Sequence, residues 1–357
     1  AAGAVFAVTV SELCALVCLL VRKKVCKRII DTSAGDTSTD RVAVIAKRLI
    51  KSCIPVSAAA IVVNLSSFID LITIPRCLNF ALSSDPGYFA ACFSDIIKAQ
   101  GGAVRLANFM YGSYTGLSWT MFMLIPSFTA MFGRSALPQI AGAWTLGNRN
   151  EFERKVTVVL RSNFVIGFPL YLGLSAMSRQ ILEFLFSGRQ QEVTVSATSL
   201  FILGLGGVFL TLSSTFISIF QVIGRSDLPV KLMLPGCAVK LIFNVFTISV
   251  PVININGAAV STVIMYAAVA LGGYFALENV TGIDFHIIRR MAVPLSAGIV
   301  CAFVSRIVYG LVGKSVNAVA ALFLPIASGG AVYIILLIIF NEINLKSLLN
   351  RQKRKKF

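Results

Sequence analysis

Apolar residues along this chain gather in about nine long runs, separated by shorter polar or basic stretches. An α-helix rises about 1.5 Å per residue, so about 20 apolar residues in one helix cross the hydrocarbon core of a bilayer. The pattern therefore predicts an all-α polytopic membrane protein with about nine transmembrane helices. The predicted spans are residues 1–21, 52–74, 112–138, 162–185, 197–223, 232–253, 257–277, 291–312 and 318–340.

The basic residues between these spans predict the orientation of the chain. If the first span runs from outside to inside, the inner segments hold 23 of the 32 Lys and Arg residues and the outer segments hold six. Cytoplasmic loops of membrane proteins carry such an excess of positive charge. We therefore expect a cytoplasmic C-terminus in a bacterial cytoplasmic membrane.

The overall composition agrees with a lipid environment. Hydrophobic residues make up 57% of the chain and charged residues 13%, whereas soluble domains carry roughly 25% charged residues. The net charge of +17 comes from clusters between apolar runs, not from a polar folded surface of the kind that binds nucleic acid. We expect membrane lipids around the chain and no nucleic acid partner.

The residue types needed for catalysis are scarce. His286 is the single histidine, and no nucleophile, metal cluster or phosphate-binding loop is evident near it. The eight cysteines form no C-x-x-C pair and show no zinc-site spacing. We therefore expect no enzyme activity, catalytic residue, metal or cofactor.

Two polar segments and the first residue bear on the domain organisation. The Gly/Ser/Thr-rich stretch 31–40, flanked by basic residues, predicts that 22–51 is a flexible cytoplasmic linker. The basic tail 341–357 is expected at the inner face, where it would contact anionic lipid. The chain begins with Ala1 and has no signal peptide, which suggests entry partway through a longer protein.

Lys240 is the main candidate functional residue. It lies near the middle of span 232–253, too deep for its side chain to reach either interface. A charge at that depth costs about 2.5–3.5 kcal/mol on insertion scales, which makes it a functional hypothesis. Asn244 follows at i+4 and shares its face, so we expect this face to line a hydrated substrate cavity. The alternative is a buried structural partner for Lys240.

Other ionisable residues within or near the spans are weaker candidates. Glu12 lies mid-span and needs a partner or a proton. Arg134 lies near the inner interface, and Asp70 lies near the outer end of its span, where a local pair with Arg76 is the structural alternative to a cavity role. Arg306 is expected to be an interfacial anchor.

Pro126 falls inside span 112–138, so this helix is predicted to be kinked or broken there. Transporters use broken helices near the midplane to expose backbone groups to polar substrates. Membrane helices also carry proline without any transport role.

Several segments, taken in their order and spacing, resemble the multidrug/oligosaccharidyl-lipid/polysaccharide superfamily, and within it the stage V sporulation protein B and MurJ-type flippases. The segments are Ile54–Ser57, Phe68–Arg76, Tyr111–Gly112 through Pro126 to Ala136–Pro138, Phe220–Gly224, Lys240 with Asn244, and Ile255–Ala259. MurJ-type proteins usually carry an Arg near the start of the helix equivalent to 112–138. Here the stretch Tyr111–Leu117 contains none, which favours the sporulation-type branch.

The resemblance implies a fourteen-helix fold, of which this chain would hold the sixth to fourteenth helices. The implied parts are a last helix of an otherwise missing N-terminal lobe (1–21), the linker (22–51), a six-helix C-terminal lobe (52–277), two additional helices that form a groove for a lipid tail (291–340) and the basic tail (341–357).

The function that the resemblance implies is movement of a lipid-linked saccharide, such as an undecaprenyl-pyrophosphate precursor of the cell wall or of polysaccharide, by alternating access. The implied partners are this anionic substrate, membrane lipids, and a coupling ion or the membrane potential, and the protein is expected to be a monomer. The substrate-cavity residues would be Lys240, Asn244, Arg134, Glu12 and Asp70. The alternatives are a cation-coupled multidrug antiporter of the same superfamily and a non-transporting scaffold in cell-wall or spore assembly.

Overall fold

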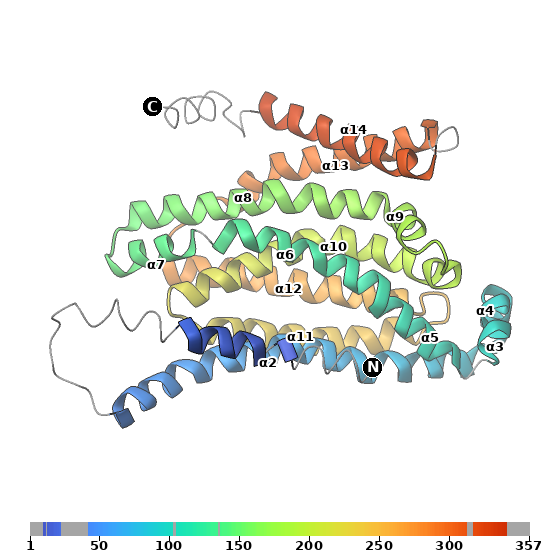
Figure 1. The fold of residues 1–357 in the computed structure, drawn as a ribbon, viewed down its shortest axis with the longest axis horizontal. Helices are drawn as coiled ribbons and strands as arrows, with labels where there is room; N and C mark the ends of the chain where they lie inside the picture. Colours follow the sequence, from blue (N-terminus) through green and yellow to red (C-terminus); the bar gives the residue numbers. More distant parts are fainter. Residues whose placement is uncertain are drawn as a thin grey trace. The chain divides into compact units, whose positions relative to one another are not determined.

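The computed structural model describes residues 10–11, 13–22, 42–102, 105–134, 136–312 and 317–340. In these ranges all the regular elements are helices, which confirms the predicted all-α class (Figure 1). They are α2 (Val42–Ser84), α3 (Pro86–Cys92), α4 (Ser94–Gln100), α5 (Leu106–Ser113), the π-helix η2 (Tyr114–Trp119), α6 (Thr120–Arg134), α7 (Leu137–Thr145), α8 (Arg149–Ala176), α9 (Ser178–Leu185), α10 (Gln190–Val222), α11 (Asp227–Ile248), α12 (Asn256–Thr281), α13 (Ile287–Val312) and α14 (Ala318–Ile339).

Seven of the described helices are long and apolar enough to cross a membrane, and they correspond to seven of the nine predicted spans. The predicted span 112–138 is divided among α5, η2 and α6. The predicted span 1–21 lies partly outside the described residues, and its described part is the apolar helix Leu13–Arg22. The count of nine therefore stays a prediction.

By its internal contacts the chain divides into two units, residues 1–53 and residues 54–357. The predicted linker 22–51 is wrong over its last ten residues, because α2 begins at Val42. Residues 23–41, which include the Gly/Ser/Thr-rich stretch, lie outside the described part of the chain, as does the tail 341–357. Basic residues such as Lys47 and Lys51 are good helix formers, so they extend the apolar helix beyond the hydrophobic run.

Helix α10 is the centre of the larger unit. It contacts α12 on one side and α8 on another, and it also touches α5, η2, α6, α7, α9 and α11. Three further helix pairs extend the bundle: α11 packs on α12, α13 packs on α8, and α14 packs on α13 (Figure 1). A helix with apolar residues on all its faces is usually surrounded by other helices. The buried residues of α10 fit this position.

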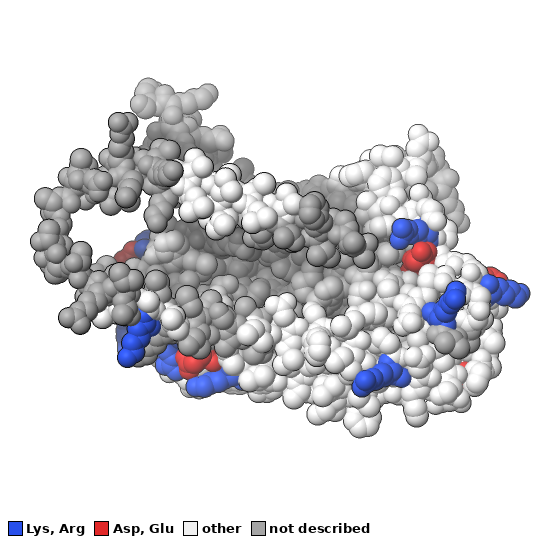
Figure 2. Space-filling model, turned by 60° about the horizontal axis from the view of Figure 1, so that its bottom comes forward, with Lys and Arg blue, Asp and Glu red and all other residues white. Residues whose placement is uncertain are grey.

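Charged side chains are sparse on the face in Figure 2 and lie mainly towards its two ends. Large apolar side chains such as Phe246, Leu271 and Phe303 are more than half exposed. A soluble protein rarely exposes so many, whereas lipid solvates them. This surface agrees with the transmembrane assignment.

The predicted break at Pro126 is not present, because helix α6 continues through this residue, and the kink stays a prediction. The departure from α-helical geometry lies earlier, at the π-helix Tyr114–Trp119 between α5 and α6. A π-helical turn accommodates an extra residue and is frequent at functional sites.

Helix α8 begins well before the predicted span 162–185 and ends within it. The Asn148 side chain accepts a hydrogen bond from the backbone N–H of Glu151 at 3.1 Å and caps its start. The helix ends at Ala176, and the short helix α9 follows after Met177. The polar residues Arg149–Lys155 belong to the helix although they lack a membrane-like composition.

Two glycines of α10 permit its close approach to α8. A Cβ atom on Gly204 would lie 2.9 Å from the backbone Cα of Ser175, and one on Gly207 would lie 2.1 Å from the Tyr171 ring. Because a membrane offers no hydrophobic force between helices, such close contact through small residues supplies much of the packing energy.

We predict that Gly204→Ala lowers the stability of the bundle by about 1–3 kcal/mol, the usual cost of overpacking, because the backbone of Ser175 has to move. The measurement is unfolding of the purified protein in detergent micelles. Gly173→Ala on α8 is the matched control, since its Cβ atom would meet no atom within 4 Å. Equal stability of the two variants would contradict the proposed close approach.

Candidate functional site

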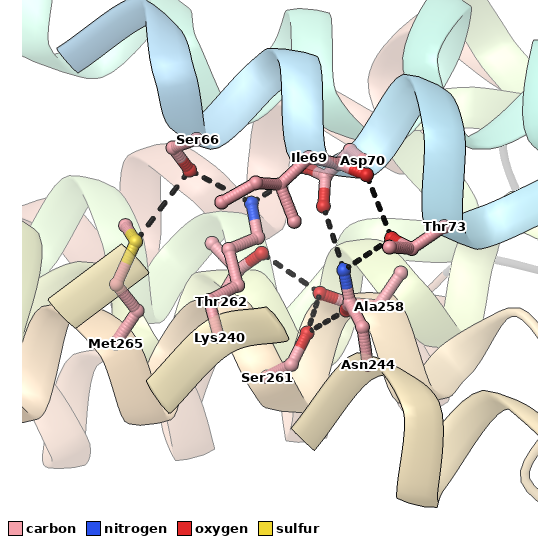
Figure 3. A network of polar contacts seen from close by, with 10 residues as sticks. All are labelled: Ser66, Ile69, Asp70, Thr73, Lys240, Asn244, Ala258, Ser261, Thr262 and Met265. Carbon is pink, nitrogen blue, oxygen red and sulfur yellow. Dashed lines mark hydrogen bonds and ion pairs between the residues drawn. The ribbon is translucent and has the colours of Figure 1, made fainter. Parts of the chain in front are cut away.

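A buried ion pair joins α2 to α11 in the interior of the larger unit. The Lys240 side chain is fully buried, and its Nζ atom lies 2.6 Å from Oδ2 of Asp70. Lys240 Nζ also donates to Oγ of Ser66 at 2.9 Å (Figure 3). The ring centroid of Trp119, the last residue of the π-helix, lies 5.6 Å from the same nitrogen, within cation–π range.

Asn244 and α12 complete the network. The Asn244 side-chain Nδ2 donates to Oδ1 of Asp70 at 3.1 Å and to Oγ1 of Thr73 at 3.0 Å. The Ser261 hydroxyl donates to Oδ1 of Asn244 (Figure 3). Both carboxylate oxygens of Asp70 are therefore hydrogen-bonded.

Helical spacing explains why these residues meet. Ser66, Asp70 and Thr73 are spaced i, i+4 and i+7 on α2, so they share one face. Lys240 and Asn244 are spaced i and i+4 on α11 and form the opposing face. A charged pair in this setting has to be hydrogen-bonded throughout, because neither lipid nor the apolar core solvates it.

This arrangement bears on two expectations. The Lys240 side chain has no exposed surface in this structure and is enclosed by Asp70, Ser66 and Trp119, so among the described residues it has the buried partner that the sequence left as the alternative. A hydrated cavity on its face stays a prediction. Asp70 does not pair with Arg76, because its charge is matched by Lys240. Asn244 shares the Lys240 face as predicted, but that face meets α2 and α12.

The remaining predicted residues lie elsewhere. Glu12 lies outside the described residues, and Arg134 ends α6 with a side chain that the structure does not describe. Arg306 is exposed, and its Nη1 atom donates to the backbone carbonyl of Ala176 at 3.0 Å.

A polar pocket of about 440 Å³ lies elsewhere in the unit, between α6, α7, α8 and α10. Seven of the ten described residues that line it carry a hydroxyl or amide side chain, and none of these ten is charged. The lining residues are Pro126, Ser127, Thr129, Leu137, Val159, Asn163, Ser214, Thr215, Ser218 and Gln221.

Asn163 is the most informative residue of this pocket. Its Nδ2 atom donates to Oγ1 of Thr215 at 2.8 Å. Its Oδ1 atom is buried and has no hydrogen-bond partner among the described residues. A buried acceptor without a donor lowers the stability of the protein by about 1–3 kcal/mol. A ligand or a water that donates to this oxygen would remove that penalty, which favours its binding.

The sequence analysis missed this pocket because none of its residues carries a charge. The available signal was the spacing of Ser214, Ser218 and Gln221, which places three polar side chains on one face of the otherwise apolar α10. Pro126, predicted as a helix kink, lines the pocket, whereas Lys240, Asn244 and Asp70 are not among its described lining residues.

The described helices form a multi-span bundle with a polar pocket and a buried ion pair in its interior, which is the architecture of a polytopic membrane protein. The family described as lipid II flippase MurJ matches residues 103–328 of this chain. The chain therefore belongs to the MurJ lipid II flippase family.

Individual relatives agree with this family. Lipid II flippase MurJ of Bacillus subtilis (strain 168) is 22% identical over 243 residues, which cover 66% of this chain and 44% of that protein. The uncharacterized membrane protein MJ1068 of Methanocaldococcus jannaschii is 27% identical over 153 residues, 43% of this chain and 29% of that protein. The chain thus spans less than half the length of these two relatives.

A solved structure described as lipid II flippase MurJ in an inward closed conformation has a similar fold. The TM-score is 0.50 at 15% sequence identity, and the match covers 93% of this chain and 82% of that chain. This likeness confirms the MurJ-type fold that the sequence predicted.

We predict that Lys240→Met destabilises the protein by about 3–5 kcal/mol, because it leaves the carboxylate of Asp70 buried without its cation. The double variant Lys240→Met with Asp70→Asn should lose clearly less than Lys240→Met alone, since it removes both charges and keeps an amide for Asn244. Unfolding of the four proteins of this double-mutant cycle in detergent measures the coupling energy. Strictly additive losses would show that the pair is not energetically coupled.

Proposed function

We propose that this chain is the transporting part of a flippase that moves a lipid-linked saccharide across the cytoplasmic membrane by alternating access. The observation that carries this proposal is the family match over residues 103–328, which covers most of the larger unit. The undecaprenyl-pyrophosphate class of substrate follows from the function named for the family. We expect transport and no catalysis from this protein.

The polar pocket is our candidate contact for the saccharide. Its serine and threonine hydroxyls and its amides can both donate and accept, and none of the described residues that line it is charged. Neutral sugar hydroxyls match such a lining better than a pyrophosphate does. A sugar hydroxyl would also supply the donor that Oδ1 of Asn163 lacks.

The Lys240 cluster has a different proposed role. Because Asp70 neutralises Lys240 at 2.6 Å, the pair presents no net charge to a pyrophosphate in this conformation. We propose that the cluster holds α2, α11 and α12 together as one body that moves during alternating access. Arg134, at the end of the helix that contributes Ser127 and Thr129 to the pocket, remains the candidate cation for the pyrophosphate.

We predict that Asn163→Leu lowers substrate translocation by about tenfold, the effect of losing one or two hydrogen bonds to the headgroup. The expected cost in stability is small, because the Thr215 hydroxyl keeps its own bond to the carbonyl of Thr211. The measurement is translocation of a lipid-linked precursor in cells that depend on the full-length protein.

The control for this variant is Thr157→Val on the same helix. The Thr157 hydroxyl is buried without a partner and lies outside the pocket, so its loss should leave transport unchanged. Normal transport by Asn163→Leu at matched protein level would remove the pocket from the proposal while leaving the flippase assignment intact. Absence of any precursor transport by the wild-type protein would remove the assignment itself.

We also propose that the C-terminus is cytoplasmic, on the excess of Lys and Arg in the segments expected to face inward. A green fluorescent protein fused after Phe357 should fluoresce, and an alkaline phosphatase fused there should be inactive. The opposite pair of readings would invert the topology.

A further inference from the structure

A second pocket, of about 580 Å³, lies between α8, α9, α10 and α13. It shares no lining residue with the polar pocket or with the Lys240 cluster. Its lining residues are Leu172, Ser175, Ala176, Ser178, Arg179, Thr194, Ala197, Thr198, Phe201, Leu205, Ile299, Ala302, Phe303 and Arg306.

One end of this pocket is apolar. Three of the apolar lining residues are Leu172 on α8, Leu205 on α10 and Ile299 on α13. On each helix the polar lining residues lie about one to three turns away along the helix axis. Phe201 and Phe303 are 44% and 66% exposed. Such surface at membrane depth is a natural contact for a hydrocarbon chain.

The other end is cationic. Arg306 is held at the end of α8 by its bond from Nη1 to the carbonyl of Ala176, and Arg179 follows three residues later in the chain. Arg179 Nε also lies 2.7 Å from Oε1 of Glu183, so the three groups together carry a net charge of +1. A guanidinium has five N–H donors in a planar fork, which suits phosphate oxygens.

An apolar cavity with a fixed guanidinium at one end matches a molecule with an acyl chain and one negative charge. Arginines at this position would be costly if the pocket faced only hydrocarbon. The Ser178 and Thr194 hydroxyls at the same end add neutral donors for ester or phosphate oxygens.

We propose that this pocket binds an anionic glycerophospholipid, with an acyl chain between α8, α10 and α13 and the phosphate at Arg306 and Arg179. The site is separate from the proposed saccharide contact and does not depend on the flippase assignment. The bound lipid would fix α13 against α8 and α10.

The test uses the full chain purified in detergent. The midpoint of thermal unfolding is measured during titration with dioctanoyl phosphatidylglycerol, dioctanoyl phosphatidylcholine and inorganic phosphate. Phosphatidylglycerol should raise the midpoint in a saturable way, and the other two should have little effect.

Variants then locate the site. Arg306→Gln combined with Arg179→Gln should weaken phosphatidylglycerol binding by about tenfold or more, because two charge-assisted contacts are lost. Ala302→Trp, which fills the apolar part and keeps both charges, should weaken it as well. The matched control for Arg306→Gln alone is Arg289→Gln, which removes one charge at the other end of α13, and it should bind normally.

Three results would overturn the proposal. Equal stabilisation by phosphatidylcholine would show that the anionic headgroup is not recognised. Equal stabilisation by inorganic phosphate would reveal a site for soluble anions. An equal loss in Arg289→Gln would show a bulk effect of net charge. Because only the ligand-dependent shift is compared, a lower starting stability of any variant does not affect the conclusion.

Discussion

The ion pair between Lys240 and Asp70 is the interaction on which the arrangement of α2, α11 and α12 depends. Lys240 is fully buried and the Asp70 side chain is 7% exposed, and each charge would cost several kcal/mol if it were buried alone. Their contact at 2.6 Å joins residues 170 positions apart in the chain. Ser66 and Asn244 each add a hydrogen bond to the pair, and Ser261 of α12 donates in turn to Asn244. A single unmatched partner would leave a charge that neither the helices nor the lipid can solvate.

Much of the helical content followed from hydropathy. The predicted spans 197–223, 257–277, 291–312 and 318–340 lie largely within α10, α12, α13 and α14. The ends were less accurate because a helix continues for as long as its backbone hydrogen bonds are satisfied, whereas hydropathy reports only the apolar part. Residues 149–155 of α8 and 42–51 of α2 are such polar extensions.

The π-helix at Tyr114–Trp119 could not be predicted in this way. It contains ordinary helix residues and one glycine, and it packs against α10. The π-helix ends at Trp119, and this places the Trp119 ring against the ammonium group of Lys240.

The sequence identified Lys240 and Asp70 as charged residues that are costly to bury in a membrane, but it did not show that they pair with each other. Lys240 and Asp70 are each improbable in a membrane span, and the sequence identifies both. The sequence-local partner Arg76 is six positions from Asp70, and on the continuous helix α2 that spacing places the two on different faces. The true partner lies on α11, and only tertiary structure brings it close. Neutral groups such as Asn163 carry no such cost, so hydropathy and charge did not point to their pocket, and only the spacing of the polar residues on α10 could have done so.

The distribution of charge in the larger unit bears on how a flippase of this kind would select its substrate. The buried cation Lys240 is paired with Asp70, and none of the described residues that line the pocket proposed for the saccharide is charged. Selectivity at that pocket would therefore rest on hydrogen bonds, and an analogue that lacks a matching hydroxyl would leave Oδ1 of Asn163 buried without a donor. Such unpaired groups discriminate more strongly than apolar contacts do, because the penalty falls on the protein as well as on the ligand. The charged end of an anionic lipid-linked substrate would then be matched by other groups, and Arg134 at the end of the same α6 helix is the cation that we propose for it.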